Sequence, residues 1–362
     1  MDIKSDRREL LRVSGGALAA GLSTGLGGCL GGIGAPGEGG IDPSPDELTD
    51  QELMDEASPP DEIVMTDFPV PTPMYYALEK GFFEARGLNV SLTPQSINGG
   101  SRNVQAVLAG NADVAANVST ASPVKLAHQQ DQYLHMVHGV HYDGDPYVGM
   151  NFLVGQEGTV SEVSDLEGET VAMHQGGTGV VPASVKRLVE QAGLDPATDV
   201  TFRVLPLPDI VGAVANGEVA AGHVLEPAAL RAEAEDLGVT RITPAMGWLY
   251  PGNVAGYWVP AAFTQENPYT VELLRRSLGE AYAVAGSSEW ITVTAANVPW
   301  SESLLERAWD EGYAHAPIAE FGETNPLRSL EKQRDLLVTY SEDLDEMDVE
   351  PSRLLPPWDR EE

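Results

Sequence analysis

Short apolar segments typical of strands alternate with amphipathic segments typical of helices from Asp61 to Leu225, and this alternation restricts the fold more than any other feature. In the first part, the pattern predicts strands at 62–68, 89–94, 112–118, 134–141 and 151–154, with helices at 73–84 and 102–109. Strands that alternate with helices usually pair in parallel. The sequence therefore predicts an α/β fold built on mainly parallel sheets.

A second series of the same kind follows Asp165. It predicts strands at 170–174, 200–205 and 219–225, and helices at 178–192 and 210–215. The two series share a local pattern, since Leu108–Ala112 and Ala215–Val219 each place a glycine between a helix and a short apolar strand. This duplication predicts two lobes. After a further strand at 254–259, the chain to Tyr340 is expected to be mostly helical.

The only cysteine, Cys29, ends the sequence Leu26-Gly27-Gly28-Cys29 downstream of Arg7 and Arg8. Twin arginines, a weak apolar core and small residues resemble a twin-arginine export signal that ends in a lipobox. The apolar run is too short and too rich in glycine for a stable membrane span. We therefore expect residues 1–28 to be removed and Cys29 to carry lipid. The alternative is a free thiol in a leader.

The chain carries a net charge of −34, with 55 acidic and 21 basic side chains. This excess of negative charge excludes nucleic acid as an expected partner, because phosphate binding needs basic surface. Acidic residues are spread along the chain and lysine is rare, which favours a halophilic protein whose self-repulsion is screened by molar salt. The alternative is an acidic protein that selects cationic ligands. Acidic, Gly-rich and Pro-rich composition predicts a flexible tether at 29–60 and a surface tail at 346–362.

Two glycine-rich loops each follow a predicted strand and open a predicted helix. Such loops let backbone N–H groups approach a polar or anionic ligand. Neither has the Gly-Lys-Ser/Thr ending of a phosphate loop. The alternative is an ordinary turn with Ser101 or Thr178 as a helix cap, and Arg102 is either an anion-binding or an exposed side chain. The candidate ligand-binding residues here are Gly99, Gly100, Ser101, Arg102, Gln175, Gly176 and Thr178.

Other candidates lie where predicted strands end, since ligands of open α/β sheets bind beyond the carboxyl ends of the strands. Glu226 is predicted to accept a hydrogen bond from a ligand or, alternatively, to form a hydrogen bond at the hinge side or between the lobes. Aromatic candidates for a pocket wall are Phe68, Tyr142 and Tyr147, which are core residues in the alternative interpretation. The remaining candidates are Thr72, Ser119, Thr120 and His174.

His135, His138 and His141 do not predict a metal site. On a strand, His135 and His141 face one side and His138 the other. The chain also shows no recognisable nucleophile motif. We therefore expect no metal, no cofactor and no catalytic residue.

Three blocks resemble the nitrate/sulfonate/taurine family of substrate-binding proteins of ABC importers. The first has the sequence YALEKGFF at 76–83, GLNV at 87–90 and AGNADV at 109–114. The second has DLEG at 165–168, AGLD at 192–195, LP at 207–208, ANGEV at 215–219 and EP at 226–227. The third is FTQENP at 263–268. The chain departs from the family at Ala220, where an acidic residue is frequent.

The resemblance implies a two-lobed periplasmic-binding-protein-like fold (class II) with a ligand in the cleft between lobes. It implies lobe one at 61–152 and 252–345, and lobe two at 153–251. The expected function is capture of a small solute by a monomeric, lipid-anchored, extracytoplasmic lipoprotein that delivers it to an ABC permease with its ATPase. The solute would be a sulfonate, nitrate, taurine or a thiamine-pyrimidine type. The alternatives are a thiamine-pyrimidine synthase-like enzyme and a membrane-anchored sensor domain.

The lipid anchor makes a first testable prediction. Cys29→Ser removes the thiol that would carry the lipid, so the full-length protein should move from the membrane fraction to the medium. Fractionation after a high-salt wash measures this, with Ser23→Ala in the same leader as the matched control. Retention of Cys29→Ser in the membrane fraction would show that another element anchors the chain.

Overall fold

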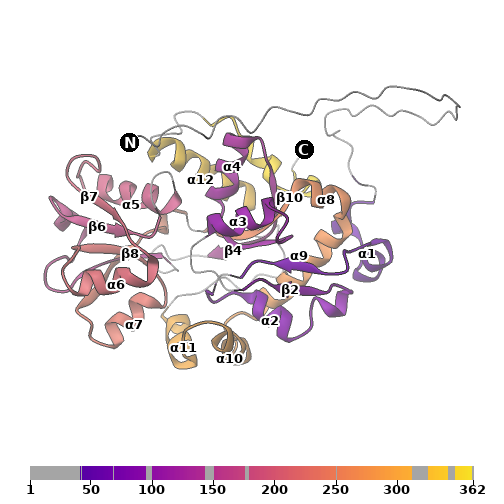
Figure 1. Cartoon of the computed structure of the whole chain (residues 1–362), viewed down its shortest axis with the longest axis horizontal. Coiled ribbons are helices and arrows are strands. Elements are labelled where there is room, and N and C mark those ends of the chain that lie inside the picture. The colour runs from indigo at the N-terminus through magenta and orange to yellow at the C-terminus, as the bar shows by residue number, and fades with distance from the viewer. Residues whose placement is uncertain are drawn as a thin grey trace, which may run out of the picture. The chain divides into compact units, whose positions relative to one another are not determined.

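The computed structural model describes residues 41, 43–67, 69–94, 100–142, 151–175, 179–249, 251–311, 325–340 and 347–360. Cys29 and the arginine pair lie outside the described residues. Within the described part of the chain, no helix combines the length and the apolar character that a membrane span requires. The described strands form hydrogen-bonded groups of two, three and five. Figure 1 shows these strands, with helices packed around them, in two lobes.

The sheet of lobe one contains strands from both ends of the folded chain. Its strands are β1 (Ile63–Met65), β2 (Val90–Leu92), β3 (Ala115–Ser119), β4 (Leu134–Tyr142) and β10 (Gly252–Pro260). β2 pairs with β1 in parallel, and β10 lies antiparallel between β3 and β4. A parallel bridge from Met65 to Val114 joins the two groups, giving the order β2-β1-β3-β10-β4.

Helices cover both faces of this sheet because successive side chains of a strand point to opposite faces. Tyr257 on β10 belongs to the core shared with the first set of helices, and its neighbour Trp258 belongs to the core shared with the second. The first set is α2 (Pro73–Glu79), α9 (Pro268–Ala283), α10 (Ser288–Asn297) and α11 (Glu302–Asp310). The second is α3 (Gly100–Leu108) and α4 (Ala121–Gln130).

Lobe two repeats this arrangement with a contiguous piece of chain. Its strands are β5 (Asn151–Gln156), β6 (Thr170–Met173), β7 (Thr201–Val204), β8 (Ala221–Leu225) and β9 (Val239–Pro244), in the order β7-β6-β8-β5-β9. β5 is antiparallel to both neighbours, as β10 is in lobe one. Helix α5 (Val180–Gln191) packs on one face, and α6 (Leu207–Ala215) and α7 (Ala228–Ala234) pack on the other.

The predicted α/β class and two-lobed fold are confirmed, and so is the glycine pattern that suggested the duplication. Gly110 and Gly217 follow α3 and α6, and both have a φ of 70°. This left-handed conformation suits glycine because it has no Cβ. The predicted helix at 73–84 is shorter than expected: α2 ends at Glu79, and a short 3₁₀ helix, η2 (Glu84–Arg86), follows. Three further short elements are α8 (Ala261–Glu266), η3 (Val163–Leu166) and η4 (Gly247–Leu249).

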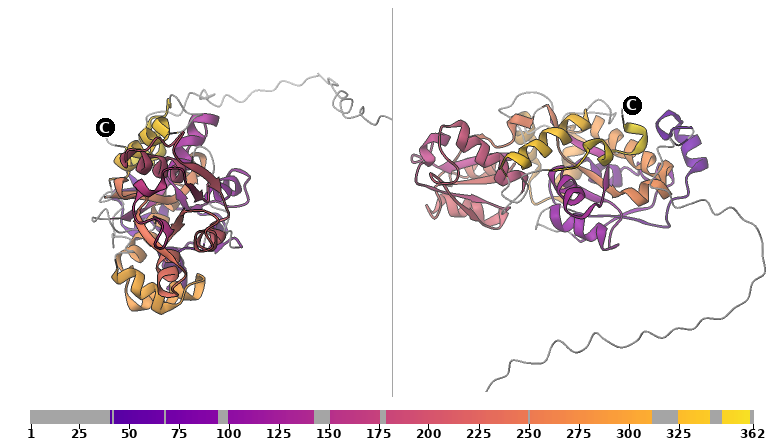
Figure 2. Two further views of the ribbon diagram at one scale, coloured as in Figure 1. Left: turned by 90° about the vertical axis from the view of Figure 1, so that its left-hand side faces the viewer. Right: turned by 90° about the horizontal axis from the view of Figure 1, so that it is seen from above.

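Helix α12 (Pro326–Tyr340) packs on both lobes. Leu330 lies in the core of lobe one with α3 and α4, whereas Leu336 and Leu337 lie in the core of lobe two with α5. Gln333 donates a hydrogen bond to the carbonyl oxygen of Asn253 at 3.0 Å, near the point where the chain re-enters lobe one. In Figure 2, α12 is the gold helix that extends from one lobe to the other.

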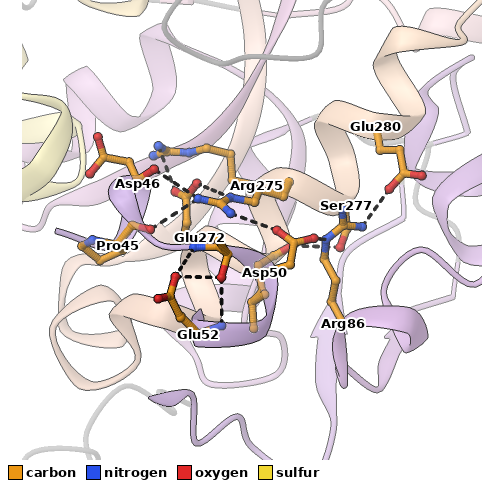
Figure 3. Close-up of polar contacts among 12 residues, drawn as sticks. Pro45, Asp46, Asp50, Glu52, Arg86, Glu272, Arg275, Ser277 and Glu280 are labelled. Atoms are coloured by element: carbon orange, nitrogen blue, oxygen red, sulfur yellow. Dashed lines mark hydrogen bonds and ion pairs between the residues drawn. The ribbon is translucent and has the colours of Figure 1, made fainter. Parts of the chain in front are cut away.

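The prediction of a flexible tether up to residue 60 is wrong for its second half. Residues Pro45–Glu47 form η1 and Asp50–Glu56 form α1, which begins with a capping box between Thr49 and Glu52. Leu53 is fully buried. Asp50 forms ion pairs with Arg86 and Arg276, each at 2.9 Å (Figure 3). The acidic composition of this segment predicted a flexible chain, because its own sequence does not reveal that Arg86 and Arg276 bind it.

The expected surface tail at 346–362 is also wrong for the residues described, 347–360. Val349, Leu354 and Leu355 are buried in the core of lobe one. The segment contains η6 (Pro351–Leu354) and η7 (Pro357–Asp359), and Asp359 forms an ion pair with Arg275 of α9. The apolar side chains between the acidic ones thus make this segment part of the fold.

The docking of α1 predicts a measurable contribution to stability. Leu53→Ala should lower the free energy of unfolding by about 2–5 kcal/mol, because it removes a fully buried side chain and leaves a cavity. Gln51→Ala on the exposed face of α1 is the matched control and should change it by less than about 1 kcal/mol. Urea denaturation measures both, and equal stability of the two variants would mean that α1 does not dock in solution.

Candidate functional site

The connections between the lobes bring the carboxyl edges of the two sheets next to each other. β4 ends at this edge of lobe one, and β5 begins at the corresponding edge of lobe two because it runs antiparallel to β8. β9 and β10 make the return connection in the same way. Since ligands of open α/β sheets bind beyond the carboxyl ends of the strands, this is where the candidate site lies.

A buried acidic group stands where β1 ends. Asp67 is 4% exposed, and its Oδ1 accepts a hydrogen bond from the hydroxyl of Tyr75 on α2 at 2.5 Å. Its backbone N–H donates to Oγ1 of Thr93, which follows β2, at 3.1 Å. Thr72, a predicted site residue, is fully buried and directly precedes α2. These contacts fix the loop between β1 and α2 at the carboxyl edge.

Polar side chains on β3 and just after it have buried atoms for which the described residues supply no hydrogen-bond partner. Asn117 has a φ of 55°, and within the described residues neither polar atom of its buried amide has a partner. The hydroxyl of Thr120 is likewise buried without a partner among those residues. Ser119 Oγ accepts a weak hydrogen bond from the N–H of Ala121 at 3.4 Å. A ligand group or water at this edge would satisfy Asn117 and Thr120.

The start of α3 lies very close to β3. A Cβ at Gly100 would lie 3.2 Å from the Cα of Val118, so a larger residue here would push β3 by a few tenths of an ångström. Arg102, in the first turn of the same helix, is exposed. Gly100 thus has a structural role whether or not a ligand binds, and Arg102 is available to a solute or to solvent.

In lobe two, two histidines and an asparagine form a polar group at the carboxyl edge. Oδ1 of Asn151, the first residue of β5, lies 3.1 Å from Nε2 of His223 on β8. The ring of His174, just after β6, lies 5.2 Å from that of His223. Burial lowers the pKa of His174 to about 4, and burial followed by the neighbouring His174 lowers the pKa of His223 well below its usual value. Both rings are therefore neutral near pH 7.

Gln175 contacts the beginning of α5. A Cβ at Gly179 would lie 2.5 Å from Oε1 of Gln175, so glycine at the cap position of α5 makes room for this side chain. The ligand-binding role of Gln175 remains a prediction.

Glu226 is committed to contacts within the protein. It is 3% exposed, its Oε2 accepts a hydrogen bond from the N–H of Leu230 at 3.0 Å, and its Oε1 lies 3.5 Å from Nη1 of Arg241. Burial raises the pKa of Glu226 to about 7, although the Leu230 N–H and the Arg241 guanidinium act in the opposite direction. Leu230 and Arg241 both lie in lobe two, so these contacts hold Glu226 within its own lobe. The predicted ligand-binding role of Glu226 and the alternative of a bond between the lobes both remain predictions.

Several predicted residues cannot be placed. Phe68, Gly99, Gly176, Thr178 and Tyr147 lie outside the described residues, as do the side chains of Ser101 and Tyr142. Their ligand-binding roles remain predictions.

His135, His138 and His141 lie on β4, as the strand pattern predicted. All three are buried, and His138 stacks on Tyr282 of α9 with ring centroids 4.6 Å apart. Burial lowers the pKa of His138 to about 4 and that of His135 to about 3. In the ranges that the structure covers, no three His, Cys, Asp or Glu side chains form a group that could hold a metal ion.

A family model described as "NMT1/THI5 like" matches residues 69–287, which contain both sheet edges and both connections between the lobes. The chain belongs to this family. The resemblance to nitrate/sulfonate/taurine binding proteins that the sequence predicted is confirmed. No curated protein sequence matches the chain.

Solved structures share the fold. The periplasmic aliphatic sulphonate binding protein SsuA from Escherichia coli is 18% identical, with a TM-score of 0.64, over 81% of this chain and 95% of that one. The periplasmic nitrate-binding protein NrtA from Synechocystis PCC 6803 is 15% identical, with a TM-score of 0.60, over 78% and 83%. SsuA from Xanthomonas axonopodis pv. citri, bound to MOPS, is 17% identical, with a TM-score of 0.64, over 83% and 96%.

The sequence analysis missed four polar residues of the two edges: Asp67, Asn117, Asn151 and His223. Asp67 directly precedes the predicted Phe68, so the strand-end rule pointed to the correct loop. Asn117 and His223 lie within strands, and their location depends on pairing register. A polar residue in an otherwise apolar buried strand is the signal that would have found them.

The raised pKa of Glu226 makes a prediction about pH. The pKa of Glu226 is about 7 in the folded protein and 4.5 without the fold, so the protonated carboxyl group stabilises the folded state. This stabilisation is fully present below about pH 4.5 and is lost as the pH rises to 7. Relative to Glu226→Gln, the wild-type protein should lose up to about 3 kcal/mol of unfolding free energy across this interval. Urea denaturation at constant high salt measures the difference. Parallel curves from pH 4.5 to 7 would contradict the shift.

Proposed function

We propose that the chain is the solute-binding lipoprotein of an ABC importer. It would hold a small solute between the carboxyl edges of its lobes and deliver it to a membrane permease. The observation that carries this proposal is the duplicated lobe in a chain of the NMT1/THI5-like family, with polar side chains gathered at both adjoining edges. The solved structures of the same fold include proteins described as binding sulfonates and nitrate.

The chemistry of the two edges supports binding by hydrogen bonds. Lobe one offers Asn117 and Thr120, whose buried polar atoms lack partners among the described residues. Lobe two offers the neutral imidazole of His174. A solute held between the edges would lose contact with water and gain these partners, so closure of the lobes around it is favoured. Arg102 is the exposed cationic candidate for an anionic solute.

The remaining parts of the proposal come from the sequence. The twin arginines and Cys29 support export and lipid anchoring on the extracytoplasmic side, with a monomer as the working form. The charge of −34 supports function in concentrated salt, where acidic surfaces are screened.

A thermal-shift assay tests the function. The full chain in molar salt is mixed with ethanesulfonate, nitrate, taurine or 4-aminopyrimidine. A solute present at 100 times its Kd should add about 2.7 kcal/mol to the unfolding free energy and raise the melting midpoint. If none of the four raises it, the proposed solute classes are wrong.

Calorimetry on variants then tests the site with the solute that binds. Arg102→Ala should weaken an anionic solute at least about tenfold, because it removes the exposed charge beside the α3 loop. Arg203→Ala, which removes an exposed arginine from β7, is the matched control and should bind like the wild type. Thr178→Ala tests the second loop. Wild-type affinity in both Arg102→Ala and Thr178→Ala would place the pocket elsewhere.

A further inference from the structure

Arg241 is surrounded by three carboxylates. It lies on β9, where Nη2 is 2.9 Å from Glu233 of α7 and Nη1 is 3.5 Å from Glu226 at the end of β8. Both of these carboxylates belong to lobe two. The third is Glu311, whose Oε2 lies 3.0 Å from Nη2. The guanidinium group is therefore the centre of a small ionic network.

Glu311 belongs to lobe one. It directly follows α11, whose Leu305 and Ala308 are buried in the same core as Trp290 of α10 and Tyr257 of β10. The ion pair between Arg241 and Glu311 consequently joins the two lobes. This contact is separate from α12, which connects the lobes near the top of the view in Figure 1, whereas α7 and α11 lie near the bottom.

A second contact supports the same junction. The guanidinium of Arg231 on α7 lies 5.5 Å from the ring centroid of Trp300, just before α11. Both residues line a groove of about 410 Å³, together with Arg307 of α11. An aromatic ring and a cation from different lobes attract each other at this distance.

The Arg241–Glu311 ion pair crosses this junction beside the Arg231–Trp300 contact and beside Leu230 of α7, which is buried in the same apolar core as Leu305 of α11. Both charged ends of the ion pair stay paired when it breaks. Arg241 remains bonded to Glu233 and Glu226, and Glu311 remains bonded to Arg307 at 2.7 Å. Breaking the crossing bond therefore leaves no isolated charge, which avoids the main cost of separating a partly buried ion pair. Such a pair suits a contact that forms and breaks repeatedly.

We propose that the Arg241–Glu311 ion pair is a latch that stabilises the present arrangement of the two lobes, with Arg241 as the positioning residue. The effect of the latch on solute binding rests on the proposed function, because solute affinity depends on the fraction of molecules in the binding-competent arrangement. The latch itself is a property of the free protein.

Electron paramagnetic resonance distance measurements on the solute-free full chain test the latch. Spin labels are placed on exposed residues of lobe one and lobe two through Ala109→Cys and Ala197→Cys in a Cys29→Ser chain. Glu311→Gln removes the charge but keeps the size of the side chain. It should lower the ratio of molecules at the main interlobe distance to molecules at all other distances by about twofold to fivefold.

Glu306→Gln is the matched control, because it removes the same charge from an exposed position of the same helix. It should leave the distance distribution of the labelled parent unchanged. Equal distributions in Glu311→Gln and the parent overturn the latch, as does an equal change in both variants. Because no solute is present, failure of the latch is distinct from failure of the proposed function, which the thermal-shift assay decides.

Discussion

The backbone pairing of β10 with β3 and β4 is the interaction on which the rest of the structure depends. β10 returns from lobe two and supplies the antiparallel strand between β3 and β4 in lobe one, as β5 does between β8 and β9 in lobe two. In each lobe, the first strand after the chain crosses from the other lobe completes the sheet: β5 in lobe two and β10 in lobe one. The two connections therefore leave and enter both sheets at their carboxyl edges, which carry Thr120 in lobe one and His174 in lobe two.

Arginines are few in this acidic chain, and several of them hold distant segments together. Arg86 and Arg276 attach α1 to α9, Arg275 attaches the C-terminal segment through Asp359, and Arg241 joins the lobes. Acidic side chains at these points have specific partners rather than facing only solvent. The excess negative charge therefore lies elsewhere on the surface, where salt screens it.

The fold was predictable wherever the signal is local. Glycine after a helix and a short apolar strand located α3, β3, α6 and β8, because capping and periodicity act over a few residues. β9 was not predicted, since its middle residues are only partly buried and include Arg241. The docking of α1 and of the C-terminal segment was also missed, because each depends on partners far away in the sequence.

The same division applies to the site. The strand-end rule placed Ser119, Thr120 and His174 at the ends of strands, where the structure has them, and their ligand-binding roles remain predictions. It did not reveal that His223 lies beside Asn151, because this contact depends on the antiparallel register of β5 and β8. It also did not reveal that Glu226 bonds to Leu230 and Arg241 within its own lobe, because these contacts depend on how α7 and β9 pack against the end of β8.

The buried C-terminal segment has a consequence for the order in which the chain folds during synthesis. All five strands of lobe two have been made once Pro244 is complete, so that sheet can assemble while synthesis continues. Lobe one must wait for β10, and its core is complete only when Leu354 and Leu355 have left the ribosome. Until β10 has been made, β3 and β4 lack their shared neighbour, and the first lobe to be started is the last to be finished.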